Sequence, residues 1–181
     1  MAYNEALPFE RGTTYFNGRT PVANEADHLL GKRFTVVDDT HQVGSPIELM
    51  VVKAEANITV ARVGVEFDTD AGDIDRQVAE ICNTAGAYGW PIDDKYVVAS
   101  TITADDLFYV VTKGLCSCTT SATAGGAASD IAQGGYVTFD GAGKIDGSPS
   151  ANNHIVGLAD STTTTTNTAI VILVGARRDS Y

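Results

Sequence analysis

Four aspartates cluster in one short segment and could supply the carboxylate oxygens that a hard cation such as Ca²⁺ prefers. These candidate metal ligands are Asp68, Asp70, Asp73 and Asp75. The segment departs from the EF-hand pattern, because Gly72 comes one place too early and Ala79 stands where the closing glutamate belongs. The sequence therefore favours a solvated acidic turn here, leaves a metal site as the weaker alternative, and predicts no cofactor.

Other residues that could do chemistry are dispersed along the chain. Pairs of adjacent aspartates begin at Asp38, Asp93 and Asp105, in positions where turn amides commonly bond to aspartate. The histidines are His28, His41 and His154, and the usual nucleophile and metalloprotease motifs do not occur. A Ser/His/Asp site assembled in space stays open, but we predict that the protein is not an enzyme.

The three cysteines are Cys82, Cys116 and Cys118, an odd number without the density of a secreted disulfide framework. Cys116 and Cys118 would place both sulfurs on one face of a strand, which leaves a tetrahedral zinc ion short of ligands. We therefore expect free, buried thiols in a protein made in a reducing cytoplasm.

The charge balance argues against a nucleic-acid partner. Twelve basic residues against 23 acidic ones give a formal net charge of -11, whereas binding to phosphates needs clustered Lys and Arg. The chain also contains no apolar run of about 18 residues, and its first residues lack the basic and apolar parts of a signal peptide. The sequence thus predicts no membrane span and no signal peptide.

Residues 1–27 are predicted to form an extended arm, because they are polar and carry aromatic side chains without helical or strand periodicity. The candidate partner-binding side chains of this arm are Tyr3, Phe9, Tyr15 and Phe16. An aromatic side chain left in water loses about 1.5–3 kcal/mol that burial would give. Either the protein's own core or a neighbouring subunit should therefore cover them, while residues 28–181 form a single β-rich domain.

Short β-branched and aromatic runs between turn residues predict an all-β fold. The first predicted strands are 32–37, 47–53 and 58–67, arranged as a meander with a bulge at Arg62. Residues 73–83 fit either a helix or an edge strand, and residues 86–91 are predicted to form a structured loop.

The same pattern continues to the end of the chain. The later predicted strands are 96–98, 107–111 in a hairpin with 115–119, 135–139 joined by an Asp-Gly turn to 144–145, 155–159 and 169–174. The last run is apolar on both faces, which places it inside a sheet. About nine or ten short strands of this kind predict a compact β-barrel or β-sandwich.

Several segments of the C-terminal half follow one another in a recognisable order. They are 106–114, a Gly/Ala/Ser-rich stretch, 134–145, the Ile-Val-Gly-Leu-Ala run at 155–159, and the valine-rich 169–175. This succession resembles tailed-bacteriophage capsid decoration (cement) proteins. Upstream, residues 31–39 and 90–94 are similar to segments of phage head proteins.

The resemblance implies a structural virion protein that binds the outside of an icosahedral capsid and clamps neighbouring capsomers together. Its partner would be the major capsid protein. It would itself be a homo-oligomer, with a trimer near a threefold axis favoured. The resemblance further implies synthesis in the host bacterial cytoplasm and no catalytic residues. The predicted arm suits such a role, because an extended segment can order itself across a neighbouring subunit.

Two other functions stay open at the level of the sequence. A receptor- or glycan-binding head fibre or adhesin domain would use the threonine-rich loop 161–167 and the loop around Trp90 as its contact surface. A small β-barrel hydrolase would need a catalytic site built from residues that lie far apart in the sequence.

Overall fold

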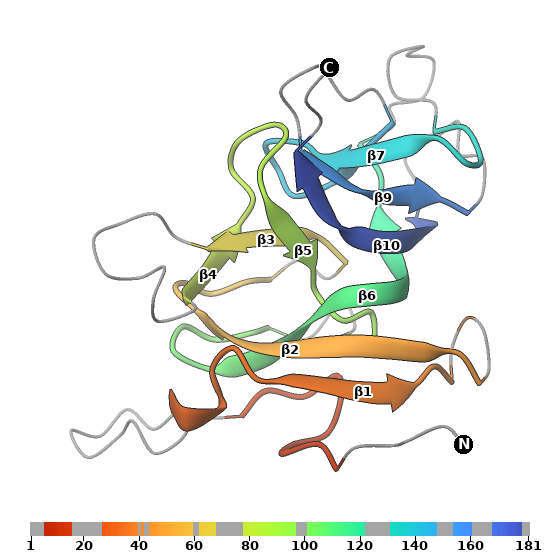
Figure 1. Cartoon of the computed structure of the whole chain (residues 1–181). Coiled ribbons are helices and arrows are strands. Elements are labelled where there is room, and N and C mark those ends of the chain that lie inside the picture. Colours follow the sequence, from red (N-terminus) through yellow and green to blue (C-terminus); the bar gives the residue numbers. More distant parts are fainter. Residues whose placement is uncertain are drawn as a thin grey trace.

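The computed structural model confirms the all-β class (Figure 1). It describes residues 6–15, 27–39, 41, 44–59, 62–67, 78–96, 101–121, 131–147, 154–160 and 168–178, with the backbone alone for residues 27, 78 and 168–178. Its regular structure is a 10-stranded sheet and one short 3-10 helix. Within this part of the chain, no helix has the length and apolar character needed to cross a membrane.

The strands follow the β-branched and aromatic runs of the sequence. In chain order the elements are η1 (Asp27–Leu29), β1 (Arg33–Val37), β2 (Pro46–Ala54), β3 (Gly64–Phe67), β4 (Val78–Ile81), β5 (Gly89–Pro91), β6 (Leu107–Thr119), β7 (Tyr136–Phe139), β8 (Ile145–Asp146), β9 (His154–Ala159) and β10 (Thr168–Arg178). The described part of the chain contains ten strands, within the predicted nine or ten, but β5 lies where the sequence predicts a loop.

Strand β6 is central because it changes partner along its length. Its first part pairs antiparallel with β2, and from Gly114 onwards it pairs antiparallel with β10. Gly114 has a φ of 108°, a conformation that favours glycine, and it follows a register shift in the β2 ladder. The predicted hairpin between residues 107–111 and 115–119 is therefore wrong, since the chain continues through Gly114 as one strand.

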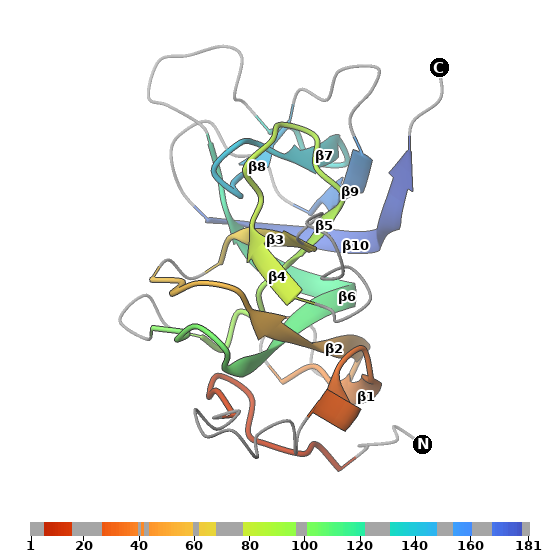
Figure 2. The same ribbon diagram turned by 90° about the vertical axis from the view of Figure 1, so that its left-hand side faces the viewer.

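The strands on the two sides of β6 form two halves; in Figures 1 and 2, β1 and β2 of the first half lie below β6, and β7, β9 and β10 of the second half lie above it. The order is β5-β3-β4-β2-β6 in the first half and β6-β10-β9-β7-β8 in the second, with β1 beside β2. In each half, one isolated β-bridge connects the far end of the sheet back to β6. In the first half Ile92, after β5, pairs with Val110 of β6, and in the second half Ile145 of β8 pairs with Thr120, directly after β6. The order ends at β5 and β8, so the ladders of the described strands do not close into the predicted barrel.

Two apolar clusters form the core. The first cluster lies within the first half and includes Val52, Val65, Trp90, Phe108 and Val110. The second cluster extends from the other face of β2 and β6 into the second half and includes Leu49, Tyr109, Cys116, Phe139 and Val156. Strands β2 and β6 contribute to both clusters, so both of their faces are buried.

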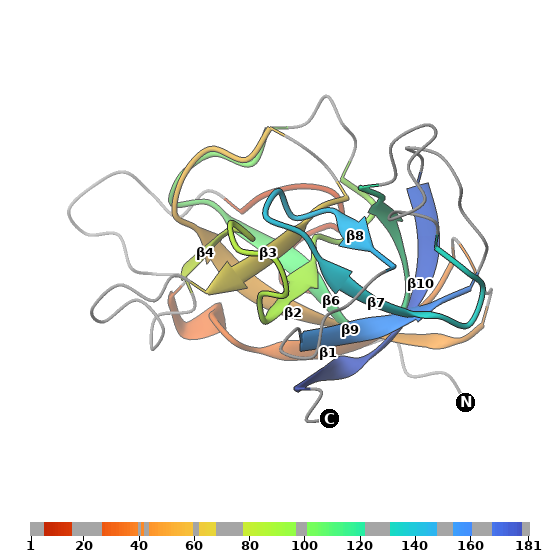
Figure 3. The ribbon, with the colours of Figure 1, turned by 90° about the horizontal axis from the view of Figure 1, so that it is seen from above.

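The two halves also meet directly, away from β6. Seen from above, the β7–β8 hairpin lies over β3 (Figure 3). There the N–H of Gly64 donates to the carbonyl oxygen of Gly143 at 2.6 Å. The ring of Phe139 occupies the place where a side chain on residue 64 would stand. Position 64 therefore requires a glycine, because the two strands approach closely.

The first half is not the predicted meander. Strands β1 and β2 pair antiparallel, but β4 separates β3 from β2 and runs parallel to β2. The ambiguous segment 73–83 thus contains a strand, and this strand lies inside the sheet and not at its edge. Periodicity could not reveal this, because a short apolar run does not specify its neighbours.

Three local predictions also have clear outcomes. Ile58 forms only an isolated bridge, and the chain turns at Arg62, with a φ of 61°, before β3 begins. The predicted strand at 96–98 does not begin at Tyr96, which lies in a turn, while residues 97–98 are outside the described residues. The final apolar run is β10, which lies between β6 and β9, inside the sheet as predicted.

Candidate functional site

The described part of the predicted arm, residues 6–15, lies on its own chain beside β1 and β2 (red in Figures 1 and 2). Leu7 and Phe9 pack against the second cluster. The ring of Phe9 stacks on Tyr109 of β6, with ring centroids 4.2 Å apart and planes inclined by 17°. Of the two coverings that the sequence leaves open for Phe9, the protein's own core is the one observed.

Two buried tyrosines hold the backbone of this segment. The Tyr109 hydroxyl donates to the carbonyl oxygen of Phe9 at 3.0 Å and accepts its N–H at 3.4 Å. The Tyr96 hydroxyl donates to the carbonyl oxygen of Thr13. Burial raises the pKa of Tyr109 to about 12 and raises the pKa of Tyr96 further. Both hydroxyls therefore stay protonated and remain donors at neutral pH.

The end of the segment is tied to the start of β6. The Thr14 hydroxyl donates to Oδ2 of Asp106 at 3.1 Å. Tyr15 pairs with Leu107 through two backbone hydrogen bonds, both with N···O distances of 2.9 Å. The Tyr15 side chain remains 41% exposed. Among the arm aromatics in the described part, Tyr15 is thus more accessible to a partner than the half-buried Phe9.

An ion pair between Arg11 and Asp93 anchors the middle of the segment. Nε of Arg11 donates to Oδ2 at 2.8 Å and Nη2 donates to Oδ1 at 2.6 Å, so the contact is bidentate. Asp93 is 0% exposed, and a carboxylate buried to this degree needs a fixed cation. The pair therefore fixes the N-terminal segment to the turn that follows β5.

The pKa values of the two partners reflect competition between burial and pairing. Burial alone would lower the pKa of Arg11, but the hydrogen bonds and charge of Asp93 raise it overall. Burial raises the pKa of Asp93, against the opposing effect of the Arg11 guanidinium. The bidentate geometry is that of an ionised pair, so we treat Asp93 as a carboxylate at neutral pH.

Asp94 connects three parts of the chain. Its Oδ2 atom bonds to Nε2 of His41 and accepts the N–H of Ser117, in β6, at 3.2 Å. The hydroxyl of Ser117 lies 3.3 Å from the same Nε2 atom. The structure thus brings together an aspartate, a histidine and a serine, the set that the sequence leaves open for a hydrolase.

This trio does not have the geometry of a catalytic triad. In a triad the carboxylate holds one ring nitrogen while the other accepts the serine proton. Here Asp94 and Ser117 meet the same nitrogen of His41, so they compete for it. Ser117 is also buried. The trio therefore serves as a structural link between the loop at His41, the turn at Asp94 and β6.

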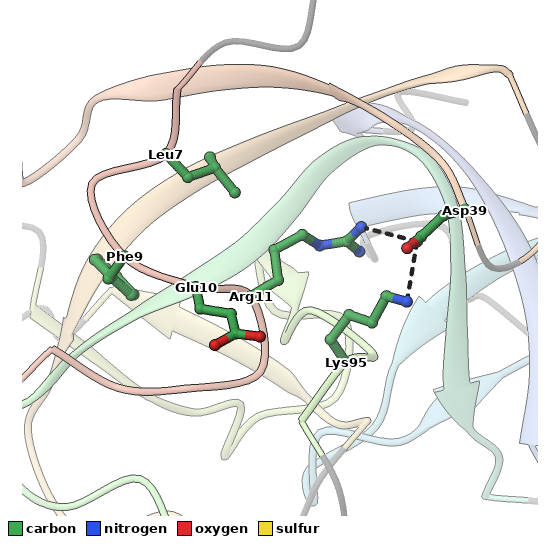
Figure 4. A pocket seen from close by; sticks show the side chains of 6 residues that line it. All are labelled: Leu7, Phe9, Glu10, Arg11, Asp39 and Lys95. Atoms are coloured by element: carbon green, nitrogen blue, oxygen red, sulfur yellow. Dashed lines mark ion pairs between the residues drawn. The ribbon is translucent and has the colours of Figure 1, made fainter.

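A pocket of about 480 Å³ opens between the N-terminal segment and the turn after β5 (Figure 4). It is lined by Leu7, Phe9, Glu10, Arg11, Asp39 and Lys95. Asp39 is 66% exposed and pairs with Nζ of Lys95 at 2.9 Å and with Nη1 of Arg11 at 3.5 Å. In Figure 4 the carboxylates of Glu10 and Asp39 lie on opposite sides of the Arg11 side chain.

A second surface feature surrounds Trp90. Trp90 itself is only 8% exposed and belongs to the first cluster, so it is not the contact residue that the sequence suggested. Its neighbour Tyr88 is 47% exposed. The Tyr88 ring meets Trp90 edge-on at 5.1 Å and His154 edge-on at 5.3 Å. Tyr88, directly before β5, is therefore the accessible aromatic side chain next to Trp90.

The cysteines behave as predicted. Cys82, Cys116 and Cys118 are free and buried. Burial raises the pKa of Cys82, and a hydrogen bond with Cys118, followed by burial, raises the pKa of Cys116. Thiols protonated in this way are poor nucleophiles and poor metal ligands.

Several predicted site residues lie outside the described residues. They are Tyr3, Phe16, the acidic residues Asp68, Asp70, Asp73 and Asp75, and the threonine-rich loop 161–167. In the part of the chain that is described, no three His, Cys, Asp or Glu side chains are grouped to hold a metal ion. The metal site at the acidic turn therefore stays a prediction.

Of the residues that line the pocket, the sequence singles out only Phe9 and, in the Asp38-Asp39 pair, Asp39. Arg11 carried one usable signal, because it is an isolated basic residue among the polar and aromatic residues of the arm. The sequence pattern at Asp93-Asp94 indicates a turn, leaves paired-carboxylate catalysis as a weaker alternative and does not indicate a buried ion pair. Nothing local indicated that Arg11 and Asp93, which are 82 residues apart, form one contact.

No family model and no curated protein matches the chain. Among solved structures, the chain is similar to the N base of the head fibre protein gp8.5 of bacteriophage phi29. The TM-score is 0.43 and the sequence identity 15%, and the match covers 72% of this chain and 97% of that one.

Proposed function

We propose that the protein is a structural component of a phage virion that binds the outer surface of an icosahedral capsid and stabilises contacts between neighbouring capsomers. Its partner is the major capsid protein, and the protein acts as a homo-oligomer, with the trimer favoured. It acts as a binding protein and not as an enzyme.

The observation that carries this proposal is the way the C-terminal segments pair. The segments that resemble decoration proteins form β6, β10, β9, β7 and β8, which are consecutive neighbours in the sheet. The C-terminal segments of the resemblance are thus neighbours in the sheet, whereas its upstream segments, 31–39 and 90–94, contribute to β1 and β5 in the first half. The arrangement of Asp94, His41 and Ser117, in contrast, gives no support to a hydrolase.

The position of the N-terminal segment changes how the clamp is expected to work. Phe9 and Arg11 are engaged with their own core, so they do not extend to a neighbouring subunit. Tyr15 is the described arm aromatic that remains accessible. We therefore expect the capsid contact to use the surface that residues 6–15 help to build, and not an arm that is released as a whole.

Binding to undecorated phage shells tests the proposal directly. The purified protein should bind such shells stoichiometrically and raise their melting temperature, because a ligand of the assembled state stabilises that state. Sedimentation of the free protein should give the mass of a trimer. No association with shells at micromolar protein would refute the capsid role, and a monomeric mass would refute the trimer alone.

The exposed Tyr88 favours a second candidate, a receptor- or glycan-binding head fibre domain. Aromatic side chains with one accessible face are typical contact residues. Replacing Tyr88 with Ala should abolish binding to host cells or to a glycan array, while Tyr136→Ala, at a tyrosine that is 51% exposed, should leave it unchanged. Equal binding by both variants and the unaltered protein would remove this candidate. Trp90→Ala would not decide it, because Trp90 is part of the core.

A further inference from the structure

We propose that an apolar row on the outer face of the second half binds a second copy of this chain. The row consists of Leu115, Ile172, Leu158 and Tyr136, one residue from each of β6, β10, β9 and β7. The inference rests on the proposed function, because it names the surface through which the homo-oligomer would form.

The register of the strands places these four residues side by side. Ile172 pairs with Leu115 on one side and with Leu158 on the other. Leu158 pairs in turn with Tyr136. Residues that pair across neighbouring strands lie on the same face of a sheet. The row therefore crosses four consecutive strands, of which β10, β9 and β7 follow one another in the upper part of Figure 1.

The row lies on the face of the sheet that points away from the core. Cys116, Ala159 and Val137 are each next in sequence to a member of the row, and all three belong to the second cluster. Successive residues of a strand point to opposite faces of the sheet. The core thus occupies one face of these strands, and the row occupies the other.

The row is incompletely covered by its own chain. Tyr136 is 51% exposed, and Leu115 and Leu158 are half-buried. Among the described residues, these three belong to neither apolar cluster. Apolar surface of this kind gains free energy when a second surface covers it. Adjacent apolar side chains on an outer face therefore indicate a contact with another molecule.

The face around the row is uncharged. The positions that alternate with the row, along the part of β6 that pairs with β10 and along β10 and β7, are Ser117, Thr119, Thr168, Ile170 and Thr138. The nearest charged residues along β6 and β9 are Lys113 and Asp160, which are exposed just beyond the paired residues. An uncharged centre with charged residues at its rim is the usual composition of a protein–protein contact.

The formal net charge of -11 favours a second copy as the occupant of this face. Two copies with the same net charge repel each other where their charged surfaces approach, so they can meet at the lowest cost through an uncharged face. A partner of opposite charge would instead be selected by the carboxylates elsewhere on the surface. In a closed trimer, the three copies would present the same row toward the common axis.

Sedimentation of the full chain tests this contact without any capsid. The variant Tyr136→Glu places a like charge in the row of every copy, and we expect it to raise the dissociation constant of self-association at least about tenfold. The matched control is Tyr88→Glu, at a tyrosine that is 47% exposed and lies directly before β5 in the first half. It should leave self-association unchanged. Circular dichroism and Trp90 fluorescence establish that both variants are folded.

Salt provides a second measurement that needs no variant. The unaltered protein should associate more tightly at about 0.5 M than at about 0.05 M sodium chloride, because ions screen the repulsion between the acidic copies and leave the apolar contact intact. Association that weakens as salt is added would mean that ion pairs hold the copies together, and this would overturn the inference.

Three further results would also overturn it. They are a monomeric unaltered protein at all concentrations, a folded Tyr136→Glu variant that associates as the unaltered protein does, and an equal loss in Tyr88→Glu. If Tyr136→Glu keeps its self-association but no longer binds phage shells, the row contacts the capsid and not a second copy.

The shell assay separates this inference from the proposed function. If the unaltered protein binds shells and Tyr136→Glu leaves self-association intact, the row inference fails and the capsid role stands. If the unaltered protein does not bind shells but Tyr136→Glu dissociates the oligomer, the capsid role fails and the row stands.

Discussion

Arg11 and Asp93 illustrate how a single contact decides the position of the N-terminal segment. The Arg11 side chain is 12% exposed, and the Asp93 carboxylate is fully buried. Removing one partner of such a pair leaves an uncompensated charge, which is more damaging than the loss of the attraction itself. The segment therefore behaves as part of the fold, although its sequence resembles that of a free arm.

Replacing Arg11 with Ala should lower the free energy of unfolding by about 3 kcal/mol, because Asp93 loses its cation in a buried site. The matched control is Arg33→Ala, which breaks the exposed pair between Arg33 and Glu48 and should cost less than about 1 kcal/mol. Urea unfolding of both variants measures the difference. Equal losses in the two variants would mean that Arg11 does not anchor the segment.

The Tyr109 hydroxyl predicts a specific loss of stability in alkali. Its pKa is raised to about 12, whereas an unfolded tyrosine ionises near pH 10. A group with a raised pKa contributes its stability in full below the unfolded pKa, and this contribution is lost as the pH rises from about 10 to about 12. Tyr109 therefore stabilises the protein at neutral pH and ceases to do so in strong alkali.

The variant Tyr109→Phe isolates this effect. At about pH 8 it should be less stable than the unaltered protein by about 1–2 kcal/mol, since the hydrogen bonds to Phe9 are lost. At about pH 11 the difference should narrow, because the unaltered protein has lost part of that stabilisation. Urea unfolding at the two pH values measures both differences. A constant difference would contradict the raised pKa.

At the residue scale, the sequence predicts that Phe9 is covered by other residues, but it does not predict the ion pair of Arg11 with Asp93. Phe9 was recognisable because an exposed phenylalanine needs a cover. The partner of Arg11 was not recognisable, because a pair separated by 82 residues leaves no local pattern. The prediction for Trp90 is wrong for a related reason, because residues 89–91 of the predicted loop form β5 and the Trp90 side chain belongs to the core.

At the scale of the element, Gly114 allows β6 to change partner in mid-strand. A Cβ atom at this position would lie 2.6 Å from Cγ2 of Ile47, and the φ of 108° is unfavourable for other residues. Gly114→Ala should therefore lower the free energy of unfolding by about 2–4 kcal/mol through strain and overpacking together. Thermal or urea unfolding measures this loss.

Gly44→Ala is the matched control for that variant. Gly44 has a similar φ of 95°, but a Cβ atom there would meet nothing within 4 Å. The control should lose only the backbone component, about 1 kcal/mol. If both variants lose the same free energy, packing against Ile47 is not what requires glycine in β6.

The existence of most strands followed from their composition, whereas their pairing did not. The runs that became β1, β2, β6, β9 and β10 are β-branched and apolar, which is sufficient to predict strands. Gly114 was interpreted as the turn of a hairpin because glycine with positive φ serves both turns and bulges. The position of β4 between β2 and β3 depends on contacts with the neighbouring strands. The amino-acid sequence of one strand does not show which strands lie beside it.

At the scale of the whole molecule, the two halves should unfold together. They share β6, and the contact of Phe139 with Gly64 joins them a second time. Fluorescence of the single tryptophan, Trp90, reports the first half, whereas far-ultraviolet circular dichroism reports the strands of both halves. The two urea transitions should coincide, as for one cooperative unit. Separate midpoints would show that the halves are independent.

Because β6 pairs with a different strand in each half, the two halves are completed at different times during synthesis. The first half is complete once β6 has emerged from the ribosome, but residues 114–119 then await β10, which is the last of the described strands in chain order. At about 5–20 residues per second, this edge stays open for several seconds on each nascent chain. An open apolar edge is a template for pairing with other chains. The yield of folded protein should therefore depend on translation speed and on nascent-chain concentration, and not only on the stability of the finished molecule.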